Sequence, residues 1–453
     1  IMISNYVYFL GFLSSALVFL SVYTRYKRSG SVICVTDPYY ITIIFYFFYY
    51  IVGQFGRISL DDFYENVYFI VSIMVLFSTV ILFIATIVTD AKVITVSFQN
   101  ELQKQIESRK FIVAAFICLI IGYIFWYLNY SRLGNISSIF TENRVDRNAK
   151  LTSMTGNLPY THFMFAGYCF YLTACLFKNK TVLKSVIISL ILILPLIIFY
   201  FLEGERSAIL KYIIASFFII SFIRFKGTVF LKANKIYLFI LLALIMSVLG
   251  NVRSGVQHYL NTGDPTQIEA QFNIKGLKML IPNEFFAVNF VTNKSVDNIL
   301  NDGHSLQFGY SYFQSIPYLF PRSVYRIAGM TKNPTIADKF GEDVRVEIYR
   351  ERKMGFGMSG IAEAFLNFHF IGVIIFPVLL FSIISLWRNF IRKTNSVYVI
   401  YLLLTLTPTF VILHRTAFAS VFSFFAYVTF ISFMAYWCSS VLLKFIPIKN
   451  IKK

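Results

Sequence analysis

The feature that most constrains this chain is its series of long apolar runs, separated by short spacers that carry charge. A helix rises 1.5 Å per residue, so about 20 apolar residues cross a hydrocarbon layer of about 30 Å. Hydrophobic residues make up 57% of the 453 positions and charged residues only 14%, whereas soluble domains carry roughly 25% charged residues. This composition excludes a soluble globular protein, and it equally excludes disordered, collagen-like and disulfide-rich chains.

The runs predict an all-α polytopic membrane protein with about eleven transmembrane helices. The expected spans are 5–23, 39–56, 66–89, 111–128, 160–177, 185–202, 207–223, 236–250, 361–387, 397–413 and 417–440. They divide the chain into three parts. Residues 1–250 hold about eight N-terminal helices, 251–360 form one large loop, and 361–453 hold about three C-terminal helices.

Lysine and arginine gather beside alternate connections between these spans, and this asymmetry predicts the orientation of the chain. The basic clusters lie at 25–28, 92–110, 178–184, 224–235, 388–393 and 444–453, which we expect to be cytoplasmic. The net charge of +19 is then mainly a topology signal and weak evidence for nucleic acid. The 251–360 loop falls on the opposite, extracytoplasmic side. Its aromatic stretches and prolines predict a structured loop, in which 305–325 is an interfacial or re-entrant element.

Charged groups at the membrane are candidates for function because a bilayer makes them expensive. The clearest are in Glu203-Gly204-Glu205-Arg206, which joins two apolar runs with almost no loop. The planar fork of Arg206 suits phosphate oxygens, and Lys211 one turn later favours an anionic ligand. Alternatively, this is a headgroup-facing tip whose charges pair with one another, and Lys211 snorkels outward.

Further candidates lie on the same predicted side. Arg253 is flanked by glycines that would let backbone approach a ligand, and Glu363 at the start of a span is the best-placed general base. The alternatives are a solvated arginine at a helix end and an acid that complements a helix dipole. The remaining substrate-binding candidates are His258, His304, Arg322, Arg326, His414 and Arg415. No metal-ligand spacing occurs, although Glu203 and Glu205 could hold a cation, and no nucleotide-binding motif is present.

Several motifs carry a family resemblance. The segments Phe320-Pro321-Arg322-Ser323 and Gly355-Phe356-Gly357-Met358-Ser359-Gly360-Ile361-Ala362-Glu363-Ala364-Phe365-Leu366-Asn367-Phe368 resemble the signature of bacterial O-antigen polymerases of the Wzy type. The Gly204-Glu205-Arg206 hairpin is also similar to an element of that family. The sequence departs at His369, where a glycine is usual, and at Arg326, where a proline-rich turn is commoner.

The resemblance implies a GT-C-like glycosyltransferase of the bacterial inner membrane, multi-pass, with its active site facing the periplasm. The implied reaction moves a growing glycan from undecaprenyl diphosphate to the non-reducing end of an incoming undecaprenyl-diphosphate oligosaccharide, during O-antigen or capsule synthesis. Arg206 and Arg253 would neutralise the diphosphate, and Glu363 or an outer histidine would act as base. No cofactor and no metal are implied. The expected partners are the lipid-linked substrates, membrane lipids and a chain-length regulator protein.

Two alternatives remain open at this stage. A flippase for lipid-linked oligosaccharides also needs many helices and cations, but transporters usually have related halves, sites near the midplane and short loops. An O-antigen ligase shares the helices, the large outer loop and the diphosphate-linked donor. Only the Gly360-Ile361-Ala362-Glu363 type of motif separates the ligase from the polymerase.

Overall fold

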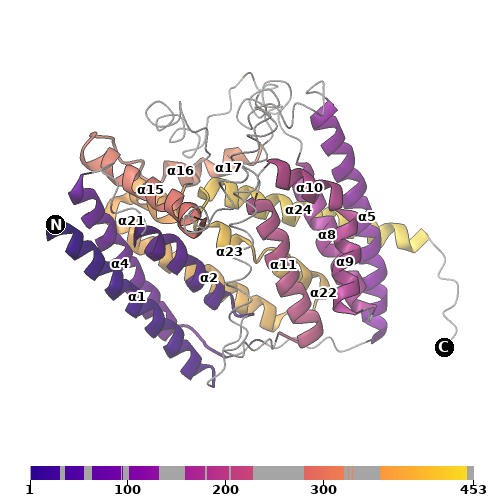
Figure 1. The fold of residues 1–453 in the computed structure, drawn as a ribbon. Helices are drawn as coiled ribbons and strands as arrows, with labels where there is room; N and C mark the ends of the chain where they lie inside the picture. Colours follow the sequence, from indigo (N-terminus) through magenta and orange to yellow (C-terminus); the bar gives the residue numbers. More distant parts are fainter. Residues whose placement is uncertain are drawn as a thin grey trace, which may run out of the picture. The chain divides into compact units, whose positions relative to one another are not determined.

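The computed structural model describes residues 2–30, 36–55, 64–92, 94, 101–131, 159–178, 181–203, 206–227, 280–320, 325, 329 and 358–445. Every regular element in these ranges is a helix (Figure 1). The chain divides into two compact units, each assembled from separate stretches of sequence. Unit 1 contains 1–93, 230–389 and 409–423, and unit 2 contains 94–229, 390–408 and 424–453.

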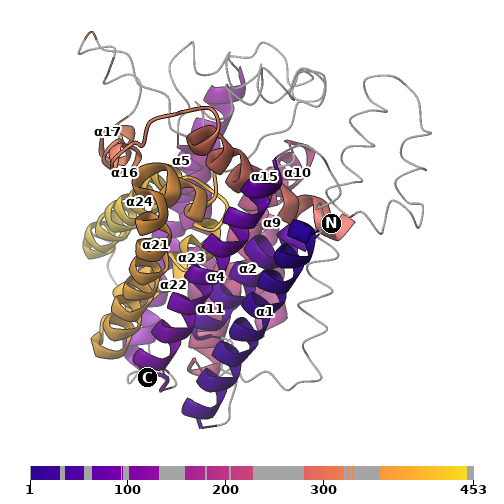
Figure 2. The same cartoon turned by 90° about the vertical axis from the view of Figure 1, so that its left-hand side faces the viewer.

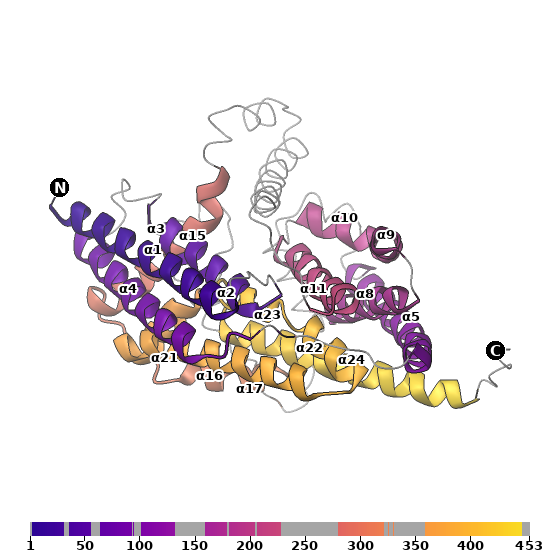
Figure 3. The same ribbon diagram turned by 90° about the horizontal axis from the view of Figure 1, so that it is seen from below.

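Unit 1 is built on two long apolar helices that run side by side, α1 and α4 (Figure 3). Its helices are α1 (Met2–Arg28), α2 (Pro38–Tyr46), the π-helix η1 (Phe47–Val52), α3 (Gly53–Phe55), α4 (Glu65–Val88), α15 (Leu280–Leu300), α16 (Tyr310–Phe313), α17 (Ser315–Tyr318), most of α21 (Gly360–Lys393), α23 (Thr409–Ile412) and the start of α24 (Phe418–Phe445). Asp37 begins α2 as its N-cap, accepting a hydrogen bond from the backbone N–H of Tyr39.

Unit 2 is built on the pair α5 and α8, which also lie side by side (Figure 3). Its helices are α5 (Glu101–Ser131), α8 (Tyr160–Phe177), α9 (Val182–Leu192), α10 (Leu194–Glu203), α11 (Arg206–Phe225), α22 (Val397–Thr405) and the remainder of α24. Aromatic rings fill its interior. Phe170 stacks on Tyr401 with ring centroids 4.2 Å apart, and Phe111 packs against both.

The all-helical membrane character predicted from sequence is confirmed, whereas the count of eleven spans is not shown. Six helices in the described ranges are long and apolar enough to cross a membrane, namely α1, α4, α5, α11, α21 and α24. The bent pair α9 and α10 would make a seventh span, and Pro38–Val52 and Val397–Ile412 are shorter apolar helical segments. α8 has the bounds expected for a span but is not among the six. The span expected at 236–250 lies outside the described residues.

Two predicted spans are broken in the structure. α9 and α10 meet at an angle of 71° around Ile193, two residues before Pro195, whose ring and missing N–H prevent an uninterrupted helix. In α21 the break lies at Phe368 and His369, which have non-helical backbone angles. The first half of α21 is therefore the short segment 360–367, and this segment carries Glu363.

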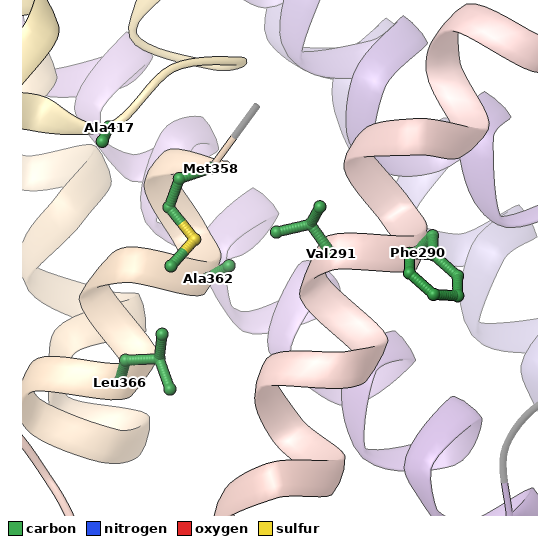
Figure 4. Close-up of a cluster of buried hydrophobic side chains, with 6 residues drawn as sticks. All are labelled: Phe290, Val291, Met358, Ala362, Leu366 and Ala417. Atoms are coloured by element: carbon green, nitrogen blue, oxygen red, sulfur yellow. The ribbon is translucent and has the colours of Figure 1, made fainter. Parts of the chain in front are cut away.

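The N-terminal half of α21 packs against α15 through a small apolar core (Figure 4). Met358, Ala362 and Leu366 lie on one side and Val291 of α15 points toward them. The core members are Phe290, Val291, Met358, Ala362, Leu366 and Ala417. Because these side chains are buried in both elements, they fix the position of the Glu363 turn.

Candidate functional site

Glu363 is fully enclosed in unit 1, where both of its carboxylate oxygens accept hydrogen bonds. The hydroxyl of Ser311 in α16 donates to Oε1 at 2.7 Å, and the backbone N–H of Phe418 donates to Oε2 at 2.7 Å. Only 1% of Glu363 is exposed. Phe418 is the first residue of α24, so the carboxylate also satisfies an N–H at that helix N-terminus, where negative charge is favourable.

Asn367, one turn after Glu363, completes a small polar network. Its Nδ2 donates to Ser311 Oγ and to the backbone carbonyl of Glu363, both at 2.7 Å. Ser311 therefore accepts from an amide and donates to a carboxylate, which fixes the direction of both hydrogen bonds. Asn367 Oδ1 is buried and has no partner among the described residues. It is an acceptor available to a hydroxyl or amide donor.

The break in α21 explains how the loop before α16 is held. A helix that stops at Asn367 leaves carbonyl groups without intrahelical partners. The backbone N–H groups of Gln307 and Phe308 donate to the carbonyls of Leu366 and Asn367 at 2.9 and 3.0 Å. At the other end, Ser359 Oγ accepts from the N–H of Ala362 at 3.0 Å as a helix N-cap. The 360–367 segment is thus capped at both ends.

The helix breaks at a histidine whose backbone angles are unfavourable for a residue with a Cβ. His369 has φ 55° and ψ −144°, a region that glycine adopts far more readily than residues with a Cβ. This is the position where the sequence departs from the resembling family by lacking a glycine. Gly372 follows on the next turn, and a Cβ there would collide with the carbonyl of Ala364. The two halves of α21 are therefore in close backbone contact.

His414, predicted as a substrate ligand, lies in the turn that leads to α24 and is 0% exposed. The rings of Tyr46, Tyr50 and Phe376 surround it edge-on, and neither ring nitrogen has a hydrogen-bond partner among the described residues. Tyr50 Oη donates to the His414 carbonyl at 3.1 Å. Burial lowers the pKa of His414 to about 3. This turn adjoins the start of α21, since a Cβ on Gly360 would lie 2.9 Å from the Leu413 carbonyl.

The other described candidates are dispersed. His304 is exposed in the loop between α15 and α16, and its backbone N–H donates to Asn298. Arg415 is half-buried beside His414. Lys211 belongs to unit 2, where its ammonium group lies 4.6 Å from the centre of the Phe424 ring. Lys211 is thus in an aromatic setting on α11.

The remaining predicted site residues lie wholly or in their side chains outside the described part of the chain. Glu205, Arg253, His258, Arg322 and Arg326 lie outside the described residues. Glu203 ends α10 and Arg206 begins α11, which agrees with the very short connection predicted, but their side chains are also outside the description. In the described ranges, no group of three or more His, Cys, Asp or Glu side chains could hold a metal ion.

The family model for O-antigen polysaccharide polymerase Wzy matches residues 1–444. The chain belongs to this family. A Wzy polymerase joins lipid-linked repeat units, which is a glycosyltransferase activity. No curated protein and no solved structure gives a match.

Membership in the Wzy family confirms the resemblance drawn from sequence and favours polymerisation over the ligase and flippase alternatives. It also accounts for a multi-pass membrane protein with lipid-linked substrates. The sequence singles out Glu363 as a candidate and includes Asn367 in the same motif, but it assigns no role to Asn367, Ser311 or the Phe418 N–H. Asn367 could have been found, because it follows Glu363 by four residues and so shares its helix face. Nothing in the sequence links Ser311 to Glu363 across 52 positions.

Proposed function

We propose that this Wzy polymerase transfers the growing glycan from its undecaprenyl diphosphate carrier to the non-reducing end of an incoming lipid-linked unit, on the periplasmic side of the inner membrane. The oligosaccharide belongs to an O-antigen or a capsule. The proposal adds a direction of transfer, a side of the membrane and residue roles to the family's activity. A chain-length regulator protein is its proposed partner.

The observation that carries the proposed side is an arrangement of charges in unit 1. Arg25, near the end of α1, and Arg388, near the end of α21, both pair with Asp37, at 2.7 and 2.5 Å. The basic ends of these two helices are therefore at the same end of the unit. Basic helix ends favour the cytoplasm. Glu363 lies near the opposite end of α21, which supports a site on the periplasmic side.

The proposed chemistry assigns charge neutralisation to arginine. Departure of a diphosphate needs preorganised positive charge, and Arg206 at the start of α11 and Arg253 are the residues proposed to supply it. Lys211, His258, His304, Arg322, Arg326 and Arg415 are proposed contacts for the substrate's phosphate and sugar groups. No metal ion is needed in this scheme, because guanidinium groups can neutralise a diphosphate themselves.

For Glu363 the geometry supports a positioning role. A carboxylate that is 1% exposed and accepts from Ser311 and Phe418 holds α16 and α24 against the start of α21. In this arrangement the substrate is positioned by elements that Glu363 joins, whereas the base role predicted from sequence requires the carboxylate to meet a sugar hydroxyl. The two roles give different outcomes for Glu363→Gln.

The proposed side and the arginine role can be tested together. His304→Cys, on an exposed loop and in a variant whose five native cysteines are replaced, should react with a membrane-impermeant maleimide added to spheroplasts if the site is periplasmic. Arg206→Ala should reduce polymerisation roughly 30- to 1000-fold, equivalent to about 2–4 kcal/mol, while Arg206→Lys restores little because a point charge cannot form two parallel hydrogen bonds. Arg224→Ala, near the other end of α11, removes the same charge as a control.

Two results would contradict these proposals. Labelling of residue 304 only after the inner membrane is permeabilised would place the loop in the cytoplasm and reverse every assignment of side. Long-chain glycan at wild-type levels in Arg206→Ala would remove Arg206 from the site, without affecting the family assignment.

A further inference from the structure

The segment 308–320, which contains α16 and α17, has polar side chains inside and large apolar side chains outside. Ser311, Gln314 and Ser315 are buried, with exposed fractions of 1, 9 and 2%. Phe308, Phe313, Ile316 and Phe320 point outward, with exposed fractions of 75, 72, 55 and 53%. A surface helix of a water-soluble domain shows the opposite distribution. We call the four outward residues the aromatic surface.

The inward polar groups are held by specific bonds, so the inversion is a built feature of the segment. Ser311 donates to Glu363 and accepts from Asn367, and Ser315 Oγ donates to the Tyr312 carbonyl. Tyr312 stacks on Phe368 with ring centroids 6.1 Å apart and meets the Phe418 ring edge-on at 5.3 Å. The segment therefore cannot turn its polar face outward without breaking the Glu363 network.

The aromatic surface continues the outer face of a membrane-spanning helix. Directly after the break in α21, Phe370, Ile371 and Ile374 are 37, 66 and 41% exposed. Exposed apolar residues follow along the remainder of α21, which is among the six candidate spans. Figure 2 shows α16 and α17 beside α21. A Cβ on Gly309 would lie 3.0 Å from the Phe368 ring, so the loop entering α16 is in direct contact with the break.

We propose that the aromatic surface lies in the bilayer, at the boundary between headgroups and hydrocarbon. The acyl chains of membrane phospholipids cover it. Short elements with apolar side chains on one face are stabilised at that depth by burial of the side chains in lipid. The aromatic surface is continuous with the exposed apolar side of α21, which is a candidate membrane span. Lipid that surrounds α21 would therefore cover the aromatic surface as well. The inference is independent of the proposed reaction.

This placement has a consequence for the Glu363 network. Ser311 is on the reverse side of the aromatic surface, so the carboxylate and its partners are held just beneath the membrane interface. A lipid-linked diphosphate has its phosphates at that level. The segment would then anchor the network to the membrane through side chains on the face opposite Ser311.

Site-directed spin labelling distinguishes lipid from water and from protein. The five cysteines are first replaced, and this variant is checked for polymerisation of repeat units. Single cysteines at Phe313 and Ile316 are then spin-labelled, and the protein is reconstituted in phospholipid vesicles free of polyprenyl lipid. Collision of the label with oxygen, which partitions into lipid, is compared with collision with a water-soluble nickel chelate. His304→Cys, on the exposed loop of the same unit, is the matched control.

The proposal expects labels at 313 and 316 to collide with oxygen several-fold more than with the chelate, and the label at 304 to show the reverse. Frequent collision of the 313 and 316 labels with the chelate would mean that water covers the surface. Low collision with both reagents would mean that protein covers it. A surface that becomes oxygen-accessible only when polyprenyl lipid is added would belong to the substrate's tail. Each of these three results overturns the proposal.

Discussion

At the scale of single residues, substitution of Glu363 distinguishes a positioning role from a catalytic one. Glu363→Gln keeps the shape of the side chain, and its amide can accept from the Phe418 N–H while donating to Ser311 Oγ, but the Ser311 hydroxyl then loses the acceptor that Glu363 Oε1 provides. We expect about 1–3 kcal/mol of lost stability from that unpaired hydroxyl, and most polymerisation retained with an unchanged pH profile. The measurement is the length and amount of glycan that the purified variant makes from lipid-linked substrate.

Glu363→Ala is the companion variant, because it leaves the Phe418 N–H and Ser311 without their partner. Buried groups that lose a partner cost about 1–3 kcal/mol each, so Ala should lose both stability and activity. If Gln is as inactive as Ala at every pH while remaining more stable than Ala, the carboxylate acts on substrate and the base role is correct.

We expect the protonation of His414 to make the stability of the folded protein depend on pH. Burial lowers its pKa in the folded protein to about 3, from 6.5 for an unperturbed histidine. The unfolded chain therefore binds the proton first as pH falls, and the folded protein loses about 1.4 kcal/mol per pH unit between about 6.5 and 3. Above pH 6.5 both forms are neutral and the term vanishes.

The measurement is the unfolding temperature of the purified protein at pH 7.5 and pH 5.5, for wild type and His414→Phe. Phe suits the cage of Tyr46, Tyr50 and Phe376 and cannot be protonated. The drop in unfolding temperature at pH 5.5 should be smaller in His414→Phe. An identical drop in both proteins would show that His414 is not the group responsible.

At the scale of an element, the break in α21 rests on one strained residue. His369 has φ 55° and ψ −144°, which costs a residue with a Cβ on the order of 1–3 kcal/mol. His369→Gly should relieve that strain and raise stability relative to His369→Ala. Both variants lose the ring contact with Phe365, so their difference isolates the backbone term. The measurement is equilibrium unfolding in mixed detergent, and an Ala variant as stable as Gly would argue that position 369 is unstrained.

The helices differ in how fully the sequence predicts them. Apolar runs located most helices to within a few residues, and Tyr160–Phe177 was placed with the bounds observed. The bend beside Pro195 carried a recognisable signal that the span assignment did not use. The break at His369 has no signal in hydropathy, since a histidine in an apolar run does not by itself interrupt a helix. The departure from the family's glycine at this position is a sign in the sequence, and the backbone angles show what it means.

The candidate site was predictable to a similar extent. Glu363 could be found because a carboxylate in an apolar helix is conspicuous, and its helix neighbour Asn367 was within reach of the same periodicity. Ser311 and Phe418 belong to elements far from Glu363 in the sequence and meet it only through tertiary packing. Hydropathy and motif spacing carry no information about such contacts. The inward polar and outward apolar side chains of α16 and α17 were not predicted; the expectation of an interfacial or re-entrant element at 305–325 stays a prediction.

At the scale of the whole molecule, unit 1 is held together at its basic end by one carboxylate. Arg25 donates to Asp37 Oδ2 through Nε and Nη2, and it also reaches the carbonyl of Asp90 and the ring of Tyr39. Arg388 pairs with Asp37 Oδ1 and donates to the Lys92 carbonyl. Both guanidinium groups are almost completely buried. Asp37 thereby joins α1, α2, the end of α4 and α21.

Removing that carboxylate should therefore destabilise the unit far more than removing an exposed acid. Asp37→Ala leaves two buried cations facing each other and deprives α2 of its N-cap, and loss of one partner of a buried ion pair costs about 3–5 kcal/mol. Asp302→Ala is the control, because Asp302 pairs with Lys294 at 3.3 Å while its side chain is 46% exposed, so less than about 1 kcal/mol should be lost. Thermal unfolding of both purified variants would compare them, together with the amount of protein inserted in the membrane. Equal stability in the two would mean that the arginines keep enough water or backbone contacts to dispense with Asp37, and the shared end of α1 and α21 would then be fixed by apolar packing alone.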